Sequence, residues 1–448
     1  MKPMKTPCPP HHAWFPSSRY GLFIHWGPYA AIGRGEQVLV REHLDQRQYE
    51  RDACAWNPRH ADPAQWAQAA VDGGFRYAVL TARHHDGYCL WDSHLTDYTS
   101  VRQAPKRDFV HEYVEAFRQA GLRVGLYYSL GDFRIPAYWR GANDDAEGWS
   151  RFRQYIHDQV GELLTRYGKI DVLWFDGAWP HNAAAWRSHD LLAAIRQLQP
   201  HILVNNRLDS QSVLNPAIGA VEAAGESSEL GDFGTPEHHI TADPDRLWES
   251  CQTSTSRLWG YTIGEHWRTV EQLLSMLCDA ASKGGNLLLN VGPDGEGRIP
   301  PEFIERSNAI GRWLKINGEA IFGTRQGHAF EFVTRGYQTR RDHTLYLILR
   351  FHDRRSTLHM TSLATRVRSA RLLGAGSLRI RHEGEVVVLE GLPPDPPLPP
   401  FAVIEVECEG EPRPHPWDEL PLWYGDPRRY ASWAEARGKG LMSTNVAS

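Results

Sequence analysis

The chain has 448 residues, of which 41% are apolar, and its 49 basic and 54 acidic side chains give a formal net charge of −5. This length fits a large catalytic domain followed by a smaller one. The small net charge, with no basic patch or acidic tail, argues against nucleic acid and anionic membranes as partners. No run of about 18 apolar residues exists to span a bilayer.

The N-terminal residues and the cysteines both bear on the compartment. Residues 1–14 contain no apolar segment of the kind found in secretion signals, so no signal peptide is visible. The six cysteines are widely spaced and form no C-x-x-C pair, so the sequence predicts neither a zinc knuckle nor a thioredoxin-like site. We therefore expect a cytoplasmic protein with reduced cysteines.

The first two thirds of the chain alternate short apolar runs with amphipathic segments at helical spacing. Six clear runs and two weaker ones are typical of strands: residues 20–26, 77–85, 122–129, 170–176, 202–207 and 285–291, then 217–223 and 246–251. Strand–helix alternation predicts a parallel α/β sheet, and eight strands predict a (β/α)8-like TIM barrel. No G-x-G-x-x-G follows the first strand, which disfavours an open dinucleotide-binding sheet.

Polar and aromatic side chains recur at the carboxyl ends of these expected strands, which is where function gathers in a barrel of this class. The ends carry His25-Trp26, His84-His85-Asp86, Tyr127-Tyr128-Ser129, Trp174 with Asp176, Asn206-Arg207 and Asn290.

The pattern changes after Gly323 to alternating segments without helical spacing. These segments are residues 343–351, 366–373, 377–382, 385–389 and 401–408. They predict an antiparallel β-sandwich. The expected organisation is a catalytic barrel at 1–330, a β-sandwich domain at 331–410 and a C-terminal tail at 411–448.

Asp176 closes an apolar strand directly after Trp174 and Phe175, and Gly177 turns the chain away. A carboxylate beside an aromatic ring suits a cationic, sugar-like transition state. The alternative interpretation is an ordinary Asp in a turn at a strand end. A second carboxylate would come from the loop after Arg207, which contains several acids.

The histidines at the strand ends also raise the hypothesis of a metal-dependent hydrolase. Adjacent residues of a strand point to opposite sides, so His84 and His85 do not both face a barrel mouth while the strand continues. The first strand ends in Ile24-His25-Trp26 and lacks the H-x-H of barrel metallohydrolases. Hydrogen bonding to substrate hydroxyl groups is the better use of these imidazoles, and we expect no metal.

Several longer motifs resemble the α-L-fucosidases of glycoside hydrolase family 29, in the same order, from about residue 20 to residue 323. The motifs are Phe23-Ile24-His25-Trp26-Gly27, Leu80-Thr81 with His84-His85-Asp86-Gly87, Gly125-Leu126-Tyr127-Tyr128-Ser129, Val172-Leu173-Trp174-Phe175-Asp176-Gly177 and Ser282-Lys283-Gly284-Gly285-Asn286-Leu287-Leu288-Leu289-Asn290-Val291-Gly292-Pro293. That family has a (β/α)8-like barrel followed by a β-sandwich, which agrees with the pattern of the chain.

The resemblance implies a role for each matching residue. Asp176 is expected to be the catalytic nucleophile, and Glu237 the acid/base, with Glu226 and Glu229 as alternatives in a variable loop. The residues expected around the sugar are His25, His84, His85, Tyr127, Trp174, Arg207 and, near its methyl group, Trp259. In one departure, Glu36-Gln37 stands where the family commonly has Glu-Trp. We interpret Glu36 as a substrate-binding carboxylate and Gln37 as the replacement of a stacking ring.

The implied activity is that of a retaining exo-α-L-fucosidase acting on a fucosylated oligosaccharide or glycoside by double displacement. For this mechanism the two carboxyl groups should lie roughly 5–5.5 Å apart. The alternatives are a related α-L-glycosidase, for example one acting on an α-L-galactoside, and an inactive fucose-binding protein. No metal or organic cofactor is expected, and the sequence leaves open whether the chain forms a homo-oligomer.

Overall fold

The computed structural model describes residues 8–210, 213–215, 220–222, 230–243, 245–327, 336–350, 354–361, 363–384 and 386–414. The chain divides into two compact units, Met1–Gly323 and Thr324–Ser448. Of the expected C-terminal tail, residues 415–448 lie outside the described part of the chain.

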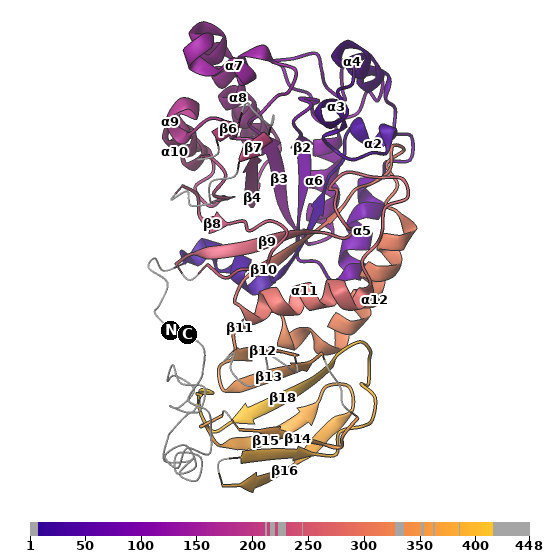
Figure 1. The fold of residues 1–448 in the computed structure, drawn as a ribbon, viewed down its shortest axis with the longest axis vertical. Helices are drawn as coiled ribbons and strands as arrows, with labels where there is room; N and C mark the ends of the chain where they lie inside the picture. Colours follow the sequence, from indigo (N-terminus) through magenta and orange to yellow (C-terminus); the bar gives the residue numbers. More distant parts are fainter. Residues whose placement is uncertain are drawn as a thin grey trace, which may run out of the picture. The chain divides into compact units, whose positions relative to one another are not determined.

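The first unit is an eight-stranded parallel barrel (Figure 1). Its strands are β1 (Tyr20–Ile24), β2 (Tyr77–Arg83), β3 (Arg123–Ser129), β4 (Val172–Asp176), β5 (Leu203–Val204), β8 (Phe233–Gly234), β9 (Leu247–Thr253) and β10 (Asn286–Val291). They pair in the order β5-β4-β3-β2-β1-β10-β9-β8, always in parallel. A single parallel bridge between Asn205 and Phe233 joins the two edge strands and closes the ring.

The barrel class predicted from the sequence is confirmed, but one of its strands was assigned wrongly. Residues 217–223 were expected to form a barrel strand, whereas the described part, β7 (Ala220–Glu222), pairs antiparallel with β6 (Val213–Asn215) outside the barrel. The barrel position belongs to β8. This strand has only two residues, which is too short to produce an alternating pattern in the sequence.

The helices of the first unit follow most of the strands and surround the barrel (Figure 1). They are η1 (Pro10–His12), α1 (Trp14–Ser18), α2 (Tyr29–Ile32), α3 (Val38–Arg41), α4 (Gln46–Ala55), α5 (Pro63–Gly73), α6 (Phe109–Gln119), α7 (Pro136–Asp144), α8 (Ala146–Arg166), α9 (Ala183–Trp186), α10 (Ser188–Leu198), α11 (Val270–Ser282), α12 (Pro301–Asn317) and η2 (Gly318–Ala320). Among the described residues, no helix separates β5 from β8 or β8 from β9.

Helix α6 shows how local sequence builds this outer layer. The carboxylate of Asp108 caps the helix by accepting a hydrogen bond from the backbone N–H of His111. Phe109, Tyr113 and Phe117 then recur at spacings of four residues and are all buried. Their shared stripe packs the helix on the barrel.

Aromatic and aliphatic side chains from alternate strand positions fill the barrel interior. Phe15 of α1 lies at the amino end, where its ring centre is 4.9 Å from that of Phe233 and 5.7 Å from that of Tyr77. Phe23 packs nearer the carboxyl ends of the strands, with its ring centre 5.1 Å from that of Trp174. The barrel is thus a packed core that supports the carboxyl ends of its strands.

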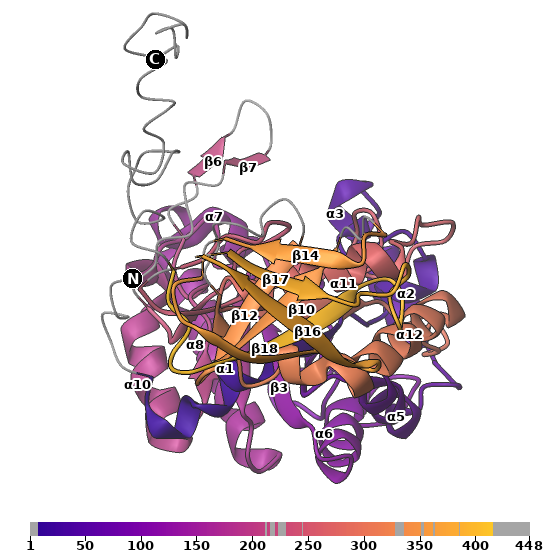
Figure 2. The same cartoon turned by 90° about the horizontal axis from the view of Figure 1, so that it is seen from below.

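The second unit is an antiparallel β-sandwich (Figure 2). Its strands are β11 (Arg325–Gln326), β12 (Gly336–Arg341), β13 (Thr344–Leu349), β14 (Thr357–Met360), β15 (Val367–Leu372), β16 (Gly376–Glu383), β17 (Val386–Glu390) and β18 (Ala402–Cys408). The long strand β16 belongs to both layers, because residues 376–378 pair with β15 and residues 379–383 pair with β17.

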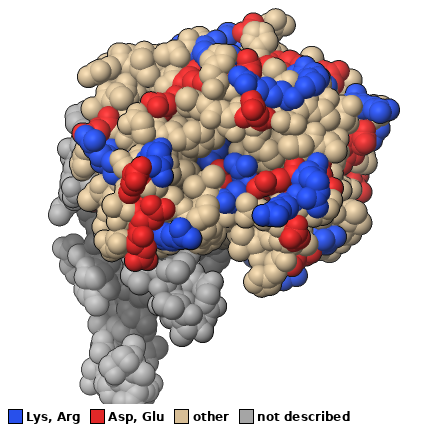
Figure 3. All heavy atoms as spheres, turned by 90° about the horizontal axis from the view of Figure 1, so that it is seen from above, with Lys and Arg blue, Asp and Glu red and all other residues tan. Residues whose placement is uncertain are grey.

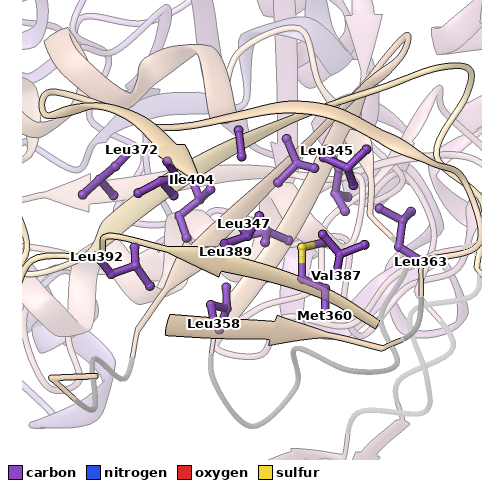
Figure 4. Packing of buried hydrophobic residues seen from close by; sticks show 14 of the residues in the cluster. Leu345, Leu347, Leu358, Met360, Leu363, Leu372, Val387, Leu389, Leu392 and Ile404 are labelled. Atoms are coloured by element: carbon purple, nitrogen blue, oxygen red, sulfur yellow. The ribbon is translucent and has the colours of Figure 1, made fainter. Parts of the chain in front are cut away.

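The core of this unit comes from residues spaced two apart on facing strands (Figure 4). Leu345, Leu347 and Leu349 of β13 point into the core, together with side chains of β14 and β17 such as Leu358 and Leu389.

None of the helices in the described part of the chain combines the length and the hydrophobicity that a membrane span requires.

Replacing Leu347 by alanine tests how much this core stabilises the second unit. Leu347 is fully buried in the cluster, so Leu347→Ala should destabilise the second unit by about 3 kcal/mol through lost burial and a residual cavity. Hydrogen exchange of peptides from β13 and β18 measures this directly. The exposed Leu198→Ala should leave that exchange unchanged, and equal protection in both variants would contradict the assignment of Leu347 to the core.

Candidate active site

The parallel strands bring their carboxyl ends to one end of the barrel, and all the described residues predicted for the site lie on or just after these ends. Figure 3 looks onto this end, where charged groups of both signs are interspersed with uncharged side chains. In chain order the residues are His25 and Glu36 after β1, His84 and His85 after β2, Tyr127 in β3, Trp174 and Asp176 in β4, Arg207 after β5, Glu237 after β8 and Trp259 after β9.

Asp176 lies at the end of β4 with 18% of its side chain exposed. Its Oδ2 accepts a hydrogen bond from the hydroxyl of Tyr127 at 2.9 Å, and its Oδ1 lies 3.3 Å from Arg207 Nη1. Burial by itself would raise the pKa of this carboxyl. The charge of Arg207, with hydrogen bonds from Tyr127 and the Gly177 N–H, outweighs burial and holds the pKa below its ordinary value. Asp176 is therefore ionised at neutral pH.

Arg207 links Asp176 to the second predicted carboxylate, Glu237. The same Nη1 atom lies 3.3 Å from Asp176 Oδ1 and 2.9 Å from Glu237 Oε2. Because both oxygens contact one nitrogen, they lie no more than about 6.2 Å apart, the sum of the two distances. The guanidinium is itself held in place by Thr235, which accepts bonds of 2.9 and 3.1 Å, and by the Trp174 ring at 4.8 Å.

The backbone around Glu237 places this side chain. Glu237 forms a parallel bridge with Cys251 of β9. The Cys251 N–H donates to the Pro236 carbonyl at 3.1 Å, and the His238 N–H donates to the Cys251 carbonyl at 3.2 Å. These bonds extend the β8–β9 pairing to the barrel mouth, where the Glu237 side chain is 33% exposed. The alternatives Glu226 and Glu229 lie outside the described residues.

His85 is held in one tautomer. Its Nδ1 lies 2.6 Å from Ser129 Oγ, and that hydroxyl donates its only proton to the Gly131 carbonyl at 2.8 Å. Nδ1 must therefore carry the imidazole proton, which leaves Nε2, 3.5 Å from Asp176 Oδ2, as an acceptor in the neutral ring. Burial lowers the pKa of His85, against the opposing charge of Asp176, so the ring is neutral and Arg207 supplies the positive charge near Asp176.

His25 is oriented in the same way. Its Nδ1 lies 2.6 Å from Asn290 Oδ1, and the Asn290 amide donates to the Trp259 carbonyl at 2.7 Å, which fixes the orientation of the amide. Nδ1 again carries the proton, and Nε2 remains an acceptor. Burial lowers the pKa of His25 to about 3, so this ring is also neutral. Neutral imidazoles with a free acceptor suit the hydroxyl groups of a sugar.

His84 is the third imidazole of this group, and burial holds its pKa well below the ordinary value. Its ring stacks on Tyr127, with centres 5.5 Å apart and planes 10° apart. The buried Nδ1 has no hydrogen-bond partner among the described residues. The stack fixes the ring against β3 and leaves one unsatisfied polar atom beside the site.

Glu36 is buried and holds the loop after β9. Its Oε2 accepts hydrogen bonds from the backbone N–H groups of Trp259 at 3.0 Å and Gly260 at 2.8 Å. The Trp259 ring in turn packs 5.2 Å from His25. Glu36 thus positions an aromatic wall of the site, and its predicted contact with substrate stays a prediction. Gln37 lies beside it, half-buried before α3.

Glu249, which lies beneath the site, was not among the residues predicted from the sequence. This carboxylate is fully buried in β9 and accepts hydrogen bonds from Tyr77 Oη at 2.5 Å and Trp174 Nε1 at 2.9 Å. Burial raises its pKa to about 7, although both bonds oppose this effect. The signal was available, because Glu249 alternates with the inward-facing Leu247 and Cys251 in a run predicted to be a strand.

Two other features of the described residues bear on function. No group of three or more His, Cys, Asp or Glu side chains is arranged there to hold a metal ion.

A groove of about 740 Å³ lies on the outer surface between α5 and α6, lined by residues such as Arg59, Arg107 and Glu115. None of the predicted site residues contributes to that groove.

Two carboxyl groups this close, among aromatic rings and neutral imidazoles, suit the hydrolysis of a glycosidic bond. Comparisons with known proteins place the chain in that class: it is a glycoside hydrolase. The family model for alpha-L-fucosidase matches residues 5–319. The chain therefore belongs to the α-L-fucosidases of glycoside hydrolase family 29.

Individual relatives agree with this family. The tissue alpha-L-fucosidase of Bos taurus is 30% identical over 414 residues, which cover 86% of each chain. An alpha-L-fucosidase isoenzyme 1 from Paenibacillus thiaminolyticus matches with a TM-score of 0.79 and 35% identity, over 89% of this chain and 99% of that one. A family 29 enzyme from Bacteroides thetaiotaomicron gives a TM-score of 0.80 at 26% identity, over 92% of this chain and 99% of that one.

The contact between Tyr127 and Asp176 predicts a change in pKa. Tyr127→Phe removes a hydrogen bond that stabilises the ionised carboxyl, so the pKa of Asp176 should rise. Any activity that needs ionised Asp176 should then lose its acid limb at higher pH than the wild type. Carbon-13 NMR of the aspartate carboxyls and the pH profile of kcat/KM measure both effects.

Tyr128→Phe is the matched control, because its buried hydroxyl on the same strand donates to Gln159 and not to Asp176. A pKa of Asp176 that is unchanged or lower in Tyr127→Phe would contradict the assigned contact.

Proposed function

We propose that this protein is a retaining exo-α-L-fucosidase that removes terminal α-L-fucosyl residues by double displacement. One observation carries the proposal: Asp176 and Glu237 contact the same Arg207 nitrogen and therefore have oxygens within about 6.2 Å of each other. Retaining glycosidases have carboxyl groups about 5–5.5 Å apart, whereas inverting enzymes need about 6.5–9.5 Å to admit a water molecule. The limit set by Arg207 favours the retaining geometry.

In the first step, Asp176 attacks the anomeric carbon of the fucosyl group and forms a glycosyl ester, while the bond from this carbon to the leaving oxygen breaks. Glu237 gives its proton to that oxygen. The low pKa of Asp176 suits the nucleophile, because the side chain is ionised before substrate arrives.

In the second step, water attacks the same carbon and displaces Asp176, and Glu237 takes the proton from this water. Glu237 Oε2 lies 2.9 Å from Arg207 Nη1, and in the proposed first step this carboxyl turns from the guanidinium to the glycosidic oxygen.

The rest of the site supports a small, terminal sugar. Asp176 exposes only 18% of its side chain, which favours a single residue entering the mouth over an internal residue of a long chain. The Nε2 atoms of His25 and His85 are acceptors for sugar hydroxyl groups, and the Trp259 ring offers an apolar wall.

Two solved structures support the same mechanism by similarity. One is a trapped covalent intermediate of a family 29 alpha-L-fucosidase from Bacteroides thetaiotaomicron in complex with 2-fluoro-fucosyl fluoride. It matches this chain with a TM-score of 0.80 at 26% identity, over 92% of this chain and 100% of that one. An alpha-fucosidase of Thermotoga maritima, 28% identical with a TM-score of 0.71, is described in complex with a mechanism-based inhibitor.

Asp176→Ala tests the nucleophile. It should lower kcat/KM for an aryl α-L-fucoside by about 10⁴-fold or more, because the covalent step is lost. Added azide should restore part of the activity and give β-L-fucosyl azide, since a small anion then attacks once from the vacated side. Near-normal hydrolysis by this variant would refute the assignment.

Glu237→Ala tests the acid/base. The loss should be about 100-fold or more for substrates with poor leaving groups and much smaller for activated aryl fucosides, which depart without protonation. Azide should here give α-L-fucosyl azide, because the fucosyl-enzyme still forms. Glu305→Ala, at a side chain that is 83% exposed on α12, is the control. An equal loss on both substrate types would point to Glu226 or Glu229, whose alanine variants complete the series.

A further inference from the structure

A row of aromatic rings extends from His85 to the surface of the barrel mouth. The Phe133 and Trp179 rings lie 5.0 and 5.3 Å from the His85 ring. Trp139 of α7 stacks on Phe133, with centres 5.4 Å apart and planes 29° apart. We call Phe133, Trp139 and Trp179 the rim aromatics.

Hydrogen bonds tie the rim aromatics to the frame of the site. The Phe133 N–H donates to the His85 carbonyl at 2.8 Å. The Trp139 indole N–H donates to the Phe133 carbonyl at 2.9 Å, and the Tyr138 hydroxyl donates to the Trp179 carbonyl. The rings are therefore held in fixed positions relative to the imidazole that contacts Asp176.

Exposure distinguishes Trp139 from the core aromatics around it. Phe133 and Tyr138 are buried and Trp179 is half-buried, whereas 38% of Trp139 is open to solvent. Single exposed apolar residues are common and need no explanation. Trp139 differs because one ring, Phe133, contacts both its exposed indole and the His85 imidazole.

The geometry of displacement places the leaving group near these rings. In the proposed displacement the leaving oxygen departs on the side of the anomeric carbon opposite Asp176, which itself lies at the carboxyl end of β4. Glu237, the proposed proton donor, contacts the same Arg207 nitrogen as Asp176. His85 Nε2 lies 3.5 Å from that Asp176 carboxyl, and the Trp179 ring packs against the His85 imidazole. Proton donor and rim aromatics therefore border the same space.

We propose that the rim aromatics form a subsite for the leaving group, in which the C–H face of a pyranose ring stacks on Trp139 and Trp179. This subsite rests on the proposed function, since it takes the sugar from which fucose is cleaved. The preferred substrate is then a fucosylated disaccharide or longer oligosaccharide. Indole faces suit such a ring because they bury apolar surface while the sugar hydroxyl groups stay in water.

The test compares substrates with and without a sugar as leaving group. α-L-Fucosyl fluoride carries none, whereas α-L-fucosyl-galactose disaccharides with 1,2, 1,3, 1,4 and 1,6 linkages do. With the disaccharides that the wild type cleaves, Trp139→Ala should lower kcat/KM by about 10-fold or more, the usual range for one lost apolar contact. Its kcat/KM for the fluoride should stay within about twofold of the wild type. Trp139→Phe keeps a ring and should retain most of the activity on the disaccharides.

Two further variants sharpen this comparison. Leu198 lies at the end of α10 that precedes β5, at the end of the barrel opposite the site. Leu198→Ala should therefore change neither activity. Ile263 is 72% exposed in the loop after β9, and Ile263→Ala tests whether the leaving group binds there instead. A loss confined to disaccharides in Ile263→Ala but absent from Trp139→Ala would overturn the proposal. So would an equal loss on both substrates in Trp139→Ala. A wild-type protein that cleaves neither substrate would refute the proposed function, and this subsite with it.

Discussion

The site depends on one guanidinium nitrogen that contacts two carboxyl groups. Asp176 and Glu237 have oxygens no more than about 6.2 Å apart. Without Arg207, burial and the nearby carboxyl group would raise the pKa of Asp176. The cation keeps Asp176 ionised and sets the separation of the pair. Thr235 and the Trp174 ring hold this arginine in place.

Contacts from the barrel core hold Arg207 in its position. Its guanidinium lies over the Trp174 ring, and the Trp174 indole N–H donates to Glu249 deep in the barrel. Glu249 also binds the Tyr77 hydroxyl, so a buried carboxylate links the interior layers to the catalytic end. A buried acid of this kind is costly unless both oxygens are bonded, and here each oxygen accepts one hydrogen bond. The fold and the site are therefore coupled through a small number of polar contacts.

Much of the fold could be predicted from sequence, because most barrel strands with five or more residues are apolar runs that end in polar groups. Strand β9, which contains Glu249, Ser250 and Gln252, gave a weaker pattern. The two-residue strand β8 could not be predicted, since closure of the ring by Asn205 and Phe233 is a tertiary effect with no local pattern. The β-sandwich was predicted from its long strands, whereas β11, β12 and β14 were missed.

The residues of the candidate site could likewise be predicted only in part. Asp176 could be placed because a strand positions it and a motif surrounds it. Glu237 could not be separated from Glu226 and Glu229 by pattern, since its place depends on the bridge to Cys251 of β9. The bonds of Glu36 to the backbone N–H groups of the Trp259 loop were not predicted from the sequence either, and its contact with substrate stays a prediction. Which partner a side chain selects is decided by packing that one sequence does not reveal.

The most direct test of the central claim is to locate a covalent sugar on the protein. A Glu237→Gln variant incubated with 2-deoxy-2-fluoro-α-L-fucosyl fluoride should accumulate a fluorofucosyl ester, because fluoride leaves without protonation and the second step lacks its base. Peptide mass spectrometry should find this group on the peptide that contains Asp176. A label on another carboxylate, or an unlabelled protein that releases a product of inverted configuration, would contradict the account.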